Sequence, residues 1–162
     1  MTYLLNNSLQ SFLTYSLSAM EVGLISANQI DKNAIYSLSY AQKGNSGLSF
    51  GLSQFDLAKN NLAQSNFNNW LTKAGLSNLE ITNIMNFAKN PSNSGQLSFN
   101  QIESQLKSYN AIIQPILKAN ITSIAHMDEI NFNKQIGQVS NLLTNLQSSK
   151  ELGILNTLID DT

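Results

Sequence analysis

Two carboxylates and a glycine-rich segment are the parts of this chain that could do chemistry. Glu21 lies where a helical pattern ends, and Asp56 closes the segment 44–56, which contains Gly44, Gly47 and Gly51. Glycine lets the backbone form a tight turn or approach a ligand closely. Partial burial favours the protonated form of a carboxyl group, so Glu21 could protonate a glycosidic oxygen while Asp56 holds a water on the opposite side of the bond. The structural alternatives are a solvated Glu21 and an Asp56 that caps a helix.

Several neighbouring side chains could hold a sugar between these carboxylates. Gln54 and Ser49 could donate hydrogen bonds to hydroxyl and acetamido groups. Apolar faces for sugar rings could come from the aromatic residues Tyr36, Tyr40, Phe50 and Trp70. Trp70 also fits the helical spacing of a core residue.

The composition excludes several classes of protein. The chain has 162 residues, enough for one domain (1–162) with a real core, since 42% of its residues are hydrophobic. Only 12% are charged, the net charge is −1, and every basic residue is Lys. Such a surface lacks the positive footprint of a nucleic-acid-binding protein and the arginines that bind phosphate in a bidentate manner.

Neither a disulfide nor an export leader is expected. There is no Cys, so disulfides and thiolate metal sites are excluded. The N-terminal residues show neither a basic region nor a long apolar run, and no segment has the length of a membrane span. If the protein works outside the cytoplasm, a route other than a cleavable leader must carry it there.

The elements that must position these residues form a mostly helical α+β fold with one small β-hairpin. Apolar residues at helical spacing predict a helix over about 8–22, and residues 24–33 are ambiguous. Alternation over 35–40, a turn at 44–47 and a short strand at 48–50 predict the hairpin.

From Asp56 onward the pattern is helical. Asp56 is the expected cap of a helix that ends at Gly75, and Ser77 and Ser98 each open a capping box, with Glu80 and Gln101 three residues later. We expect a break at Pro115, a long amphipathic helix over about 128–147, and a short last helix over 152–159.

Two further features carry no chemistry of their own. The loop 90–101 has the glycine spacing of a calcium-binding EF-hand loop, but Asn90, Ser92, Ser94 and Gln101 stand where carboxylates belong. It is interpreted as a connection between helices. His126 is the only histidine, and no Cys accompanies it as a metal ligand, so neither a metal nor a cofactor is expected.

The segment Gly47-Leu48-Ser49-Phe50-Gly51-Leu52-Ser53-Gln54-Phe55-Asp56 resembles the glycine-rich motif of goose-type lysozymes and the Gly-Leu-Met-Gln element of soluble lytic transglycosylases. In both families a helix with the catalytic Glu precedes the motif, as Glu21-Val22-Gly23 does here. Ser53 replaces the common Met, and the interval from Glu21 to Gln54 is longer than is usual. The resemblance implies a lysozyme-like fold in which Glu21 is the general acid, Asp56 positions water, Gln54 contacts substrate, and the Phe50-Gly51-Leu52 backbone forms the floor of the cleft.

The resemblance also implies an activity. It is the cleavage, without a cofactor, of the β-1,4 bond between N-acetylmuramic acid and N-acetylglucosamine in peptidoglycan. The chain would then be a phage endolysin or an exported antibacterial toxin with an immunity protein as partner. The alternatives are a lytic transglycosylase that uses Glu21 alone, a glycosidase for another amino-sugar polymer such as chitosan, and a non-catalytic helical interaction protein.

Overall fold

The computed structural model describes residues 24–26, 29–30, 35–41, 46–93 and 95–148. In this part the protein is mostly helical with small antiparallel sheets, which confirms the predicted fold class. The predicted helices over 8–22 and 152–159, and Glu21 with them, lie outside the described residues.

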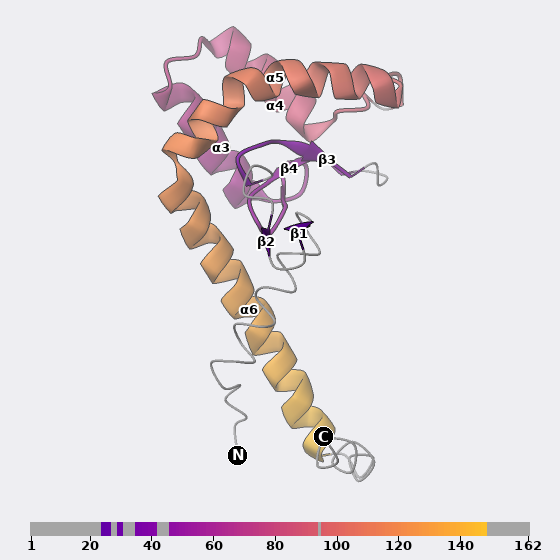
Figure 1. Cartoon of the computed structure of the whole chain (residues 1–162), viewed down its shortest axis with the longest axis vertical. Helices are drawn as coiled ribbons and strands as arrows, with labels where there is room; N and C mark the ends of the chain where they lie inside the picture. The colour runs from indigo at the N-terminus through magenta and orange to yellow at the C-terminus, as the bar shows by residue number, and fades with distance from the viewer. Residues whose placement is uncertain (1–23, 27–28, 31–34, 42–45, 94, 149–162) are drawn as a thin grey trace.

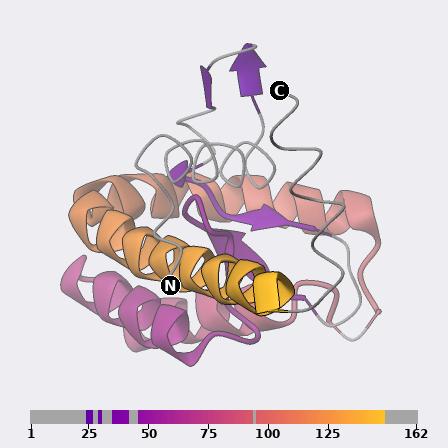
Figure 2. The same cartoon turned by 90° about the horizontal axis from the view of Figure 1, so that it is seen from below.

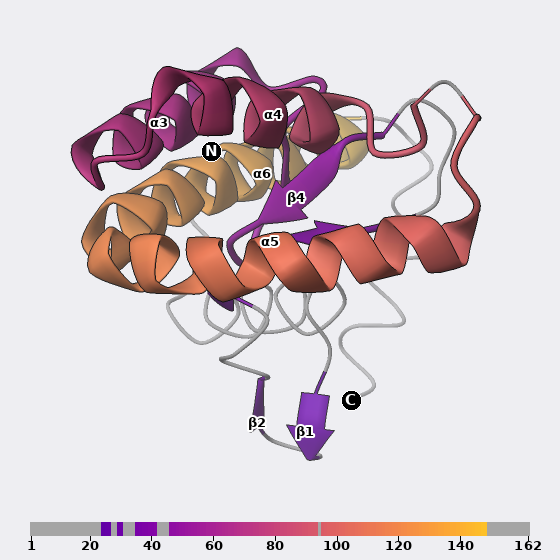
Figure 3. The ribbon, with the colours of Figure 1, turned by 90° about the horizontal axis from the view of Figure 1, so that it is seen from above.

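The strands are short and come early in the chain. β1 (Leu24–Ser26) pairs with β2 (Gln29–Ile30), so the described residues within the ambiguous range 24–33 are strands, and this ribbon stands apart from the main sheet in Figure 3. The main sheet has the order β3-β4-β5 and is antiparallel throughout, with β3 (Ser39–Tyr40), β4 (Leu48–Phe50) and β5 (Phe55–Asp56). The predicted hairpin is therefore confirmed as β3-β4, although β3 covers only the last two residues of the expected strand. β5 was not predicted.

Four helices follow among the described residues. They are α3 (Asn61–Lys73), α4 (Asn78–Lys89), α5 (Phe99–Ala119) and α6 (Ile121–Ser148). The α4 and α5 boundaries match the two capping boxes read from the sequence. The helix ahead of Gly75 ends as expected, because Gly75 adopts a left-handed conformation with φ of 82°.

The predicted break at Pro115 is wrong. Pro115 lies inside α5, which continues to Ala119 because the residues around it, Ile113, Ile116 and Leu117, are buried against the core. Proline removes one backbone donor and its ring crowds the carbonyl four residues earlier, and the buried apolar contacts on both sides outweigh these two costs. The interruption comes instead at Asn120, so α6 begins seven residues before the predicted start at Asp128.

The core lies between the sheet and the helices (Figure 3). Phe50 at its centre is fully buried, and its ring centroid lies 5.8 Å from that of Phe55, 5.9 Å from Phe67 and 5.6 Å from Trp70. α3 and α6 run side by side (Figure 2), and Asn66 Nδ2 donates to Met127 Sδ at 3.2 Å. The second half of α6 extends away from α3, α4 and α5 (Figure 1).

α5 holds the segment that leads into the sheet. The Asn110 side chain accepts from Leu38 N at 2.8 Å and donates to Leu38 O at 3.0 Å, as a neighbouring strand would. Gln114 Nε2 donates to Ser37 Oγ at 2.7 Å. Two amide side chains thus fix the position of β3 relative to α5.

Candidate functional site

The three-stranded sheet has one polar face and one apolar face. Ser49, in the middle strand, pairs with Ser39 on one side and with Asp56 on the other. Successive side chains of a strand point to opposite faces, so these three share one face. We call them the polar row, and each of its members is partly exposed. The opposite face carries Leu48, Phe50 and Phe55, which are buried in the core.

The carboxylate of Asp56 is held by two backbone amides. Its Oδ1 accepts from Gly47 N at 3.0 Å and from Ala58 N at 2.7 Å. Its Oδ2 accepts no hydrogen bond from the other residues that the structure describes. One oxygen therefore fixes the orientation of the group, and the other remains available to a water or a ligand.

The prediction that Asp56 caps the following helix is wrong. Asp56 is the last residue of β5, and α3 begins five residues later with Asn60 as its cap, whose Oδ1 accepts from Ala63 N at 3.0 Å. The bond from Ala58 N to the Asp56 side chain forms an Asx-turn, which satisfies the backbone between strand and helix.

Gln54 is fixed beside the polar row. Its Oε1 accepts from Ser39 Oγ at 2.6 Å, and its Nε2 donates to Gly51 O at 3.0 Å. Its backbone has a φ of 47°, an uncommon conformation for a residue with a side chain. These two bonds and the turn that carries Gln54 orient its side chain, and its second amide hydrogen has no acceptor among the described residues.

Four of the predicted site residues do not join this group. Phe50 is fully buried, and Trp70, named beside it as a possible sugar platform, is only 3% exposed, so neither ring can stack on a ligand. Tyr40 pairs with Leu48, which places it on the apolar face of the sheet. Tyr36 lies under the Lys118 ammonium, 5.6 Å from the ring centroid.

Gly51 is a buried turn residue and not the floor of a cleft. Its φ is 78°, and a Cβ added there would lie 3.2 Å from Phe55, 3.3 Å from Ile124 and 3.4 Å from Asp128. The turn after β4 therefore needs a residue without a side chain. Of the predicted site residues that the structure describes, Ser49, Gln54 and Asp56 come together and the others do not.

Sequence reasoning missed Asp128, a buried carboxylate on α6. Its side chain is 4% exposed, and it accepts from Ser53 N at 2.8 Å and from Leu52 N at 3.2 Å. Burial raises the pKa of Asp128, although the hydrogen bonds from Ser53 and Leu52 oppose the shift. The signal was present in the spacing, because Asp128 lies four residues from both Ile124 and Phe132 and so shares their buried helix face.

A partly open cavity of about 500 Å³ adjoins Asp128. Most of its lining is apolar and comes from α6 and from the turn after β4, including Leu52, Ile121 and Phe132. Both carboxylate oxygens of Asp128 are already occupied by backbone amides. Asp128 therefore fixes the turn that carries Gln54, and of these two carboxylates only Asp56 has an oxygen without a partner among the described residues.

Comparisons with known proteins identified no similar protein. No protein-family model, no curated protein and no solved structure matches the chain. Within the described ranges no group of three or more His, Cys, Asp or Glu side chains could hold a metal ion. None of the described helices is long and apolar enough to span a membrane.

Proposed function

We propose that this protein is a muramidase, a glycosidase that cleaves the bond between N-acetylmuramic acid and N-acetylglucosamine in peptidoglycan. The observation that supports this proposal is the carboxylate of Asp56 on a partly exposed polar face, which is fixed through Oδ1 while Oδ2 accepts no hydrogen bond from the described residues. Ser49 lies in the same row, and Gln54 is oriented beside it. An inverting glycosidase uses a preoriented carboxylate base to activate water, and hydroxyl and amide groups around it can hold the sugar.

The proposed reaction follows from these roles. Glu21 donates its proton to the glycosidic oxygen as the bond to the anomeric carbon breaks. A water held by Asp56 Oδ2 attacks that carbon and gives its proton to the carboxylate. The product has an inverted anomeric centre and a free reducing end.

The test compares variants on purified peptidoglycan, with the products identified by mass. Asp56→Asn keeps an oxygen that accepts from Gly47 and Ala58 but removes the base, and we expect the rate to fall by about 10² or more. Glu21→Gln should have an effect of the same order. Glu103→Gln, which replaces an exposed carboxylate on α5, is the matched control and should retain the wild-type rate.

Two outcomes would redirect the proposal. A product with a 1,6-anhydro end and an Asp56→Asn variant of full activity would indicate a lytic transglycosylase that uses Glu21 alone. A Glu21→Gln variant that clears peptidoglycan as fast as the wild type would refute the assignment of Glu21.

An enzyme of this kind acts on a cell wall. A phage endolysin would reach it during lysis, and an exported toxin would require an immunity protein that blocks the polar row in the producing cell. Co-purification from that cell, with loss of the complex on Asp56→Lys substitution, would test the second case.

A second candidate function is supported by α6. Its second half leaves the helical body (Figure 1), and Val139 and Leu142 on that half are 37% and 61% exposed. Ile130, nearer the start of α6, is 52% exposed. Exposed apolar residues on a protruding helix suit a non-catalytic role in binding a partner helix. That function predicts no cleavage of peptidoglycan by the wild type.

A further inference from the structure

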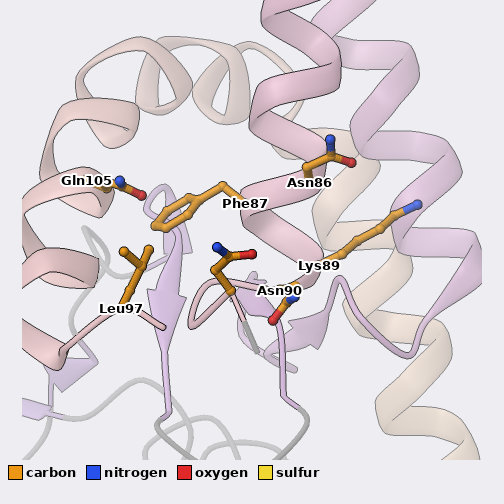
Figure 4. A pocket seen from close by; sticks show the side chains of 7 residues that line it. Asn86, Phe87, Lys89, Asn90, Leu97 and Gln105 are labelled. Carbon is orange, nitrogen blue, oxygen red and sulfur yellow. The ribbon is translucent and has the colours of Figure 1, made fainter. Parts of the chain in front are cut away.

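A pocket lined by amides lies where α4, the following loop and α5 meet (Figure 4). Its volume is about 570 Å³, within the usual range for small-molecule sites. Four carboxamide side chains contribute to it: Asn86, Asn90, Asn93 and Gln105. Phe87 and Leu97 supply the apolar part of the lining, and the Phe87 ring packs on Tyr109 with 5.1 Å between centroids. We call this site the amide pocket.

The loop that contributes Asn90, Asn93 and Leu97 is held by its own hydrogen bonds. Asn93 N donates to Asn90 O at 3.0 Å, and Leu97 N donates to Ser92 O at 3.0 Å. The Asn93 side chain donates to Gln96 Oε1 at 2.6 Å, and Pro91 is fully buried. A ligand therefore meets a largely preformed surface and loses little affinity to ordering the loop.

The charge of the pocket favours a neutral ligand. Among the described lining residues none is acidic and only Lys89 is charged, and its side chain points away from the other labelled side chains in Figure 4. The same loop has the glycine spacing of a calcium-binding loop but offers neutral amides and hydroxyls where such loops carry carboxylates. A cation would find no compensating charge there.

Carboxamides both donate and accept hydrogen bonds, as hydroxyl and acetamido groups do. Leu97 is partly exposed and can contact the apolar face of a sugar ring, whereas Phe87 is only 9% exposed and belongs mainly to the core behind the pocket. We propose that the amide pocket binds a neutral N-acetylated saccharide. The choice of an amino sugar over a peptide rests on the proposed function, but the site itself is independent of Asp56.

The pocket belongs to the same packed unit as the polar row. A Cβ added to Gly47 would lie 2.6 Å from Ala88 O, so the start of β4 and the last turn of α4 are in direct contact. Gly47 N also donates to Asp56. A glycan bound in the amide pocket would therefore be held by the body that carries the proposed catalytic face.

The experiment titrates the full-length Asp56→Asn protein with N,N′,N″-triacetylchitotriose and follows the amide signals of its nitrogen-15 spectrum. The Asp56→Asn background prevents turnover of the probe. We expect shifts in the side-chain amides of the pocket and in Phe87 and Leu97. Because Asn86 and Gln105 are exposed, Asn86→Ala combined with Gln105→Ala should leave the fold intact and weaken binding at least about tenfold. Asn69→Ala, on the exposed face of α3, is the matched control and should change nothing.

Three results would overturn the inference: no shift in the pocket at millimolar probe, equal affinity in the double variant, or tighter binding of a blocked tripeptide in the same place. Shifts confined to Ser39, Ser49 and Gln54 would refute the amide pocket while leaving the proposed function intact. Chitotriose binding in the pocket of a wild-type protein that does not cleave peptidoglycan would refute the enzyme and support the saccharide site.

Discussion

The carboxylate of Asp128 on α6 lies 2.8 Å from the backbone nitrogen of Ser53, a residue 75 positions earlier in the chain. Its second oxygen accepts from the preceding amide, that of Leu52. This pair of bonds ties the turn after β4 to the helix that closes the core. Gln54 belongs to the same turn, so the buried Asp128 on α6 determines where this candidate ligand contact lies.

The Asp128 carboxyl should make stability depend on pH in the opposite sense to most carboxylates. Its pKa in the folded protein is raised above the ordinary 3.8, so the folded state holds the proton more tightly than the unfolded chain. The resulting stabilisation is fully present below 3.8 and is lost as the pH rises through the folded pKa. Relative to Asp128→Asn, the wild type should gain stability as the pH falls from 7 toward 4, measured by urea unfolding.

The control for this prediction is Glu103→Gln, which replaces an exposed carboxylate on the neighbouring helix. Its free energy of unfolding relative to the wild type should change little over the same pH range. A difference between the wild type and Asp128→Asn that stayed flat, or grew with rising pH, would contradict the raised pKa.

Local signals in the sequence predicted the helical part of the fold well. The capping boxes at Ser77 and Ser98 fix the starts of α4 and α5, because a cap is a bond between residues three apart. The end of α3 is also a local signal, because Gly75 adopts the left-handed conformation that follows many helices. Pro115 misled the prediction, because its effect depends on distant apolar neighbours that hold α5 together.

The candidate site was harder to predict because it depends on pairing across strands. The sequence shows that side chains alternate within 48–50 but not which face is buried. The pairing of Ser49 with Asp56 places Ser49 on the polar face, and Phe50, the next residue, therefore faces the core. β5 has two residues, too few for a periodic signal. The contact between Asp128 and Ser53 is tertiary, and no local rule joins positions so far apart.

Gly47 and Gly137 should respond in opposite directions to alanine. A Cβ at Gly47 would lie 2.6 Å from both Ala58 N and Ala88 O, which are backbone atoms that cannot move aside cheaply. We expect Gly47→Ala to cost about 1–3 kcal/mol or more. Gly137 lies inside α6 with nothing within 4 Å of an added Cβ, so Gly137→Ala should stabilise by about 0.5–1 kcal/mol. Thermal unfolding of both variants measures the difference, and equal signs would contradict the packing described for β4 and α4.

Phe50 should be a core residue and not a ligand contact. Its ring is fully buried among Phe55, Phe67 and Trp70, so Phe50→Ala should lower the free energy of unfolding by about 3–5 kcal/mol. Phe99, at the start of α5, is 42% exposed, and Phe99→Ala should cost clearly less in the same denaturant experiment. Similar losses in the two variants would place Phe50 outside the core.

Asp56 should show a structural role and a chemical role that two substitutions can separate. Asp56→Ala removes the acceptor for Gly47 N and Ala58 N, and we expect a loss of about 1–3 kcal/mol in the free energy of unfolding. Asp56→Asn keeps an oxygen in that place, so its stability should lie closer to the wild type than that of the alanine variant. Both variants should cleave peptidoglycan about 10²-fold or more slowly than the wild type, because neither has a carboxylate to take the proton from water. Unfolding curves test the structural role and product formation tests the chemical role, both measured on the same preparations. An active Asp56→Asn protein would leave Asp56 with the structural role alone, as the residue that joins β5 to the start of β4.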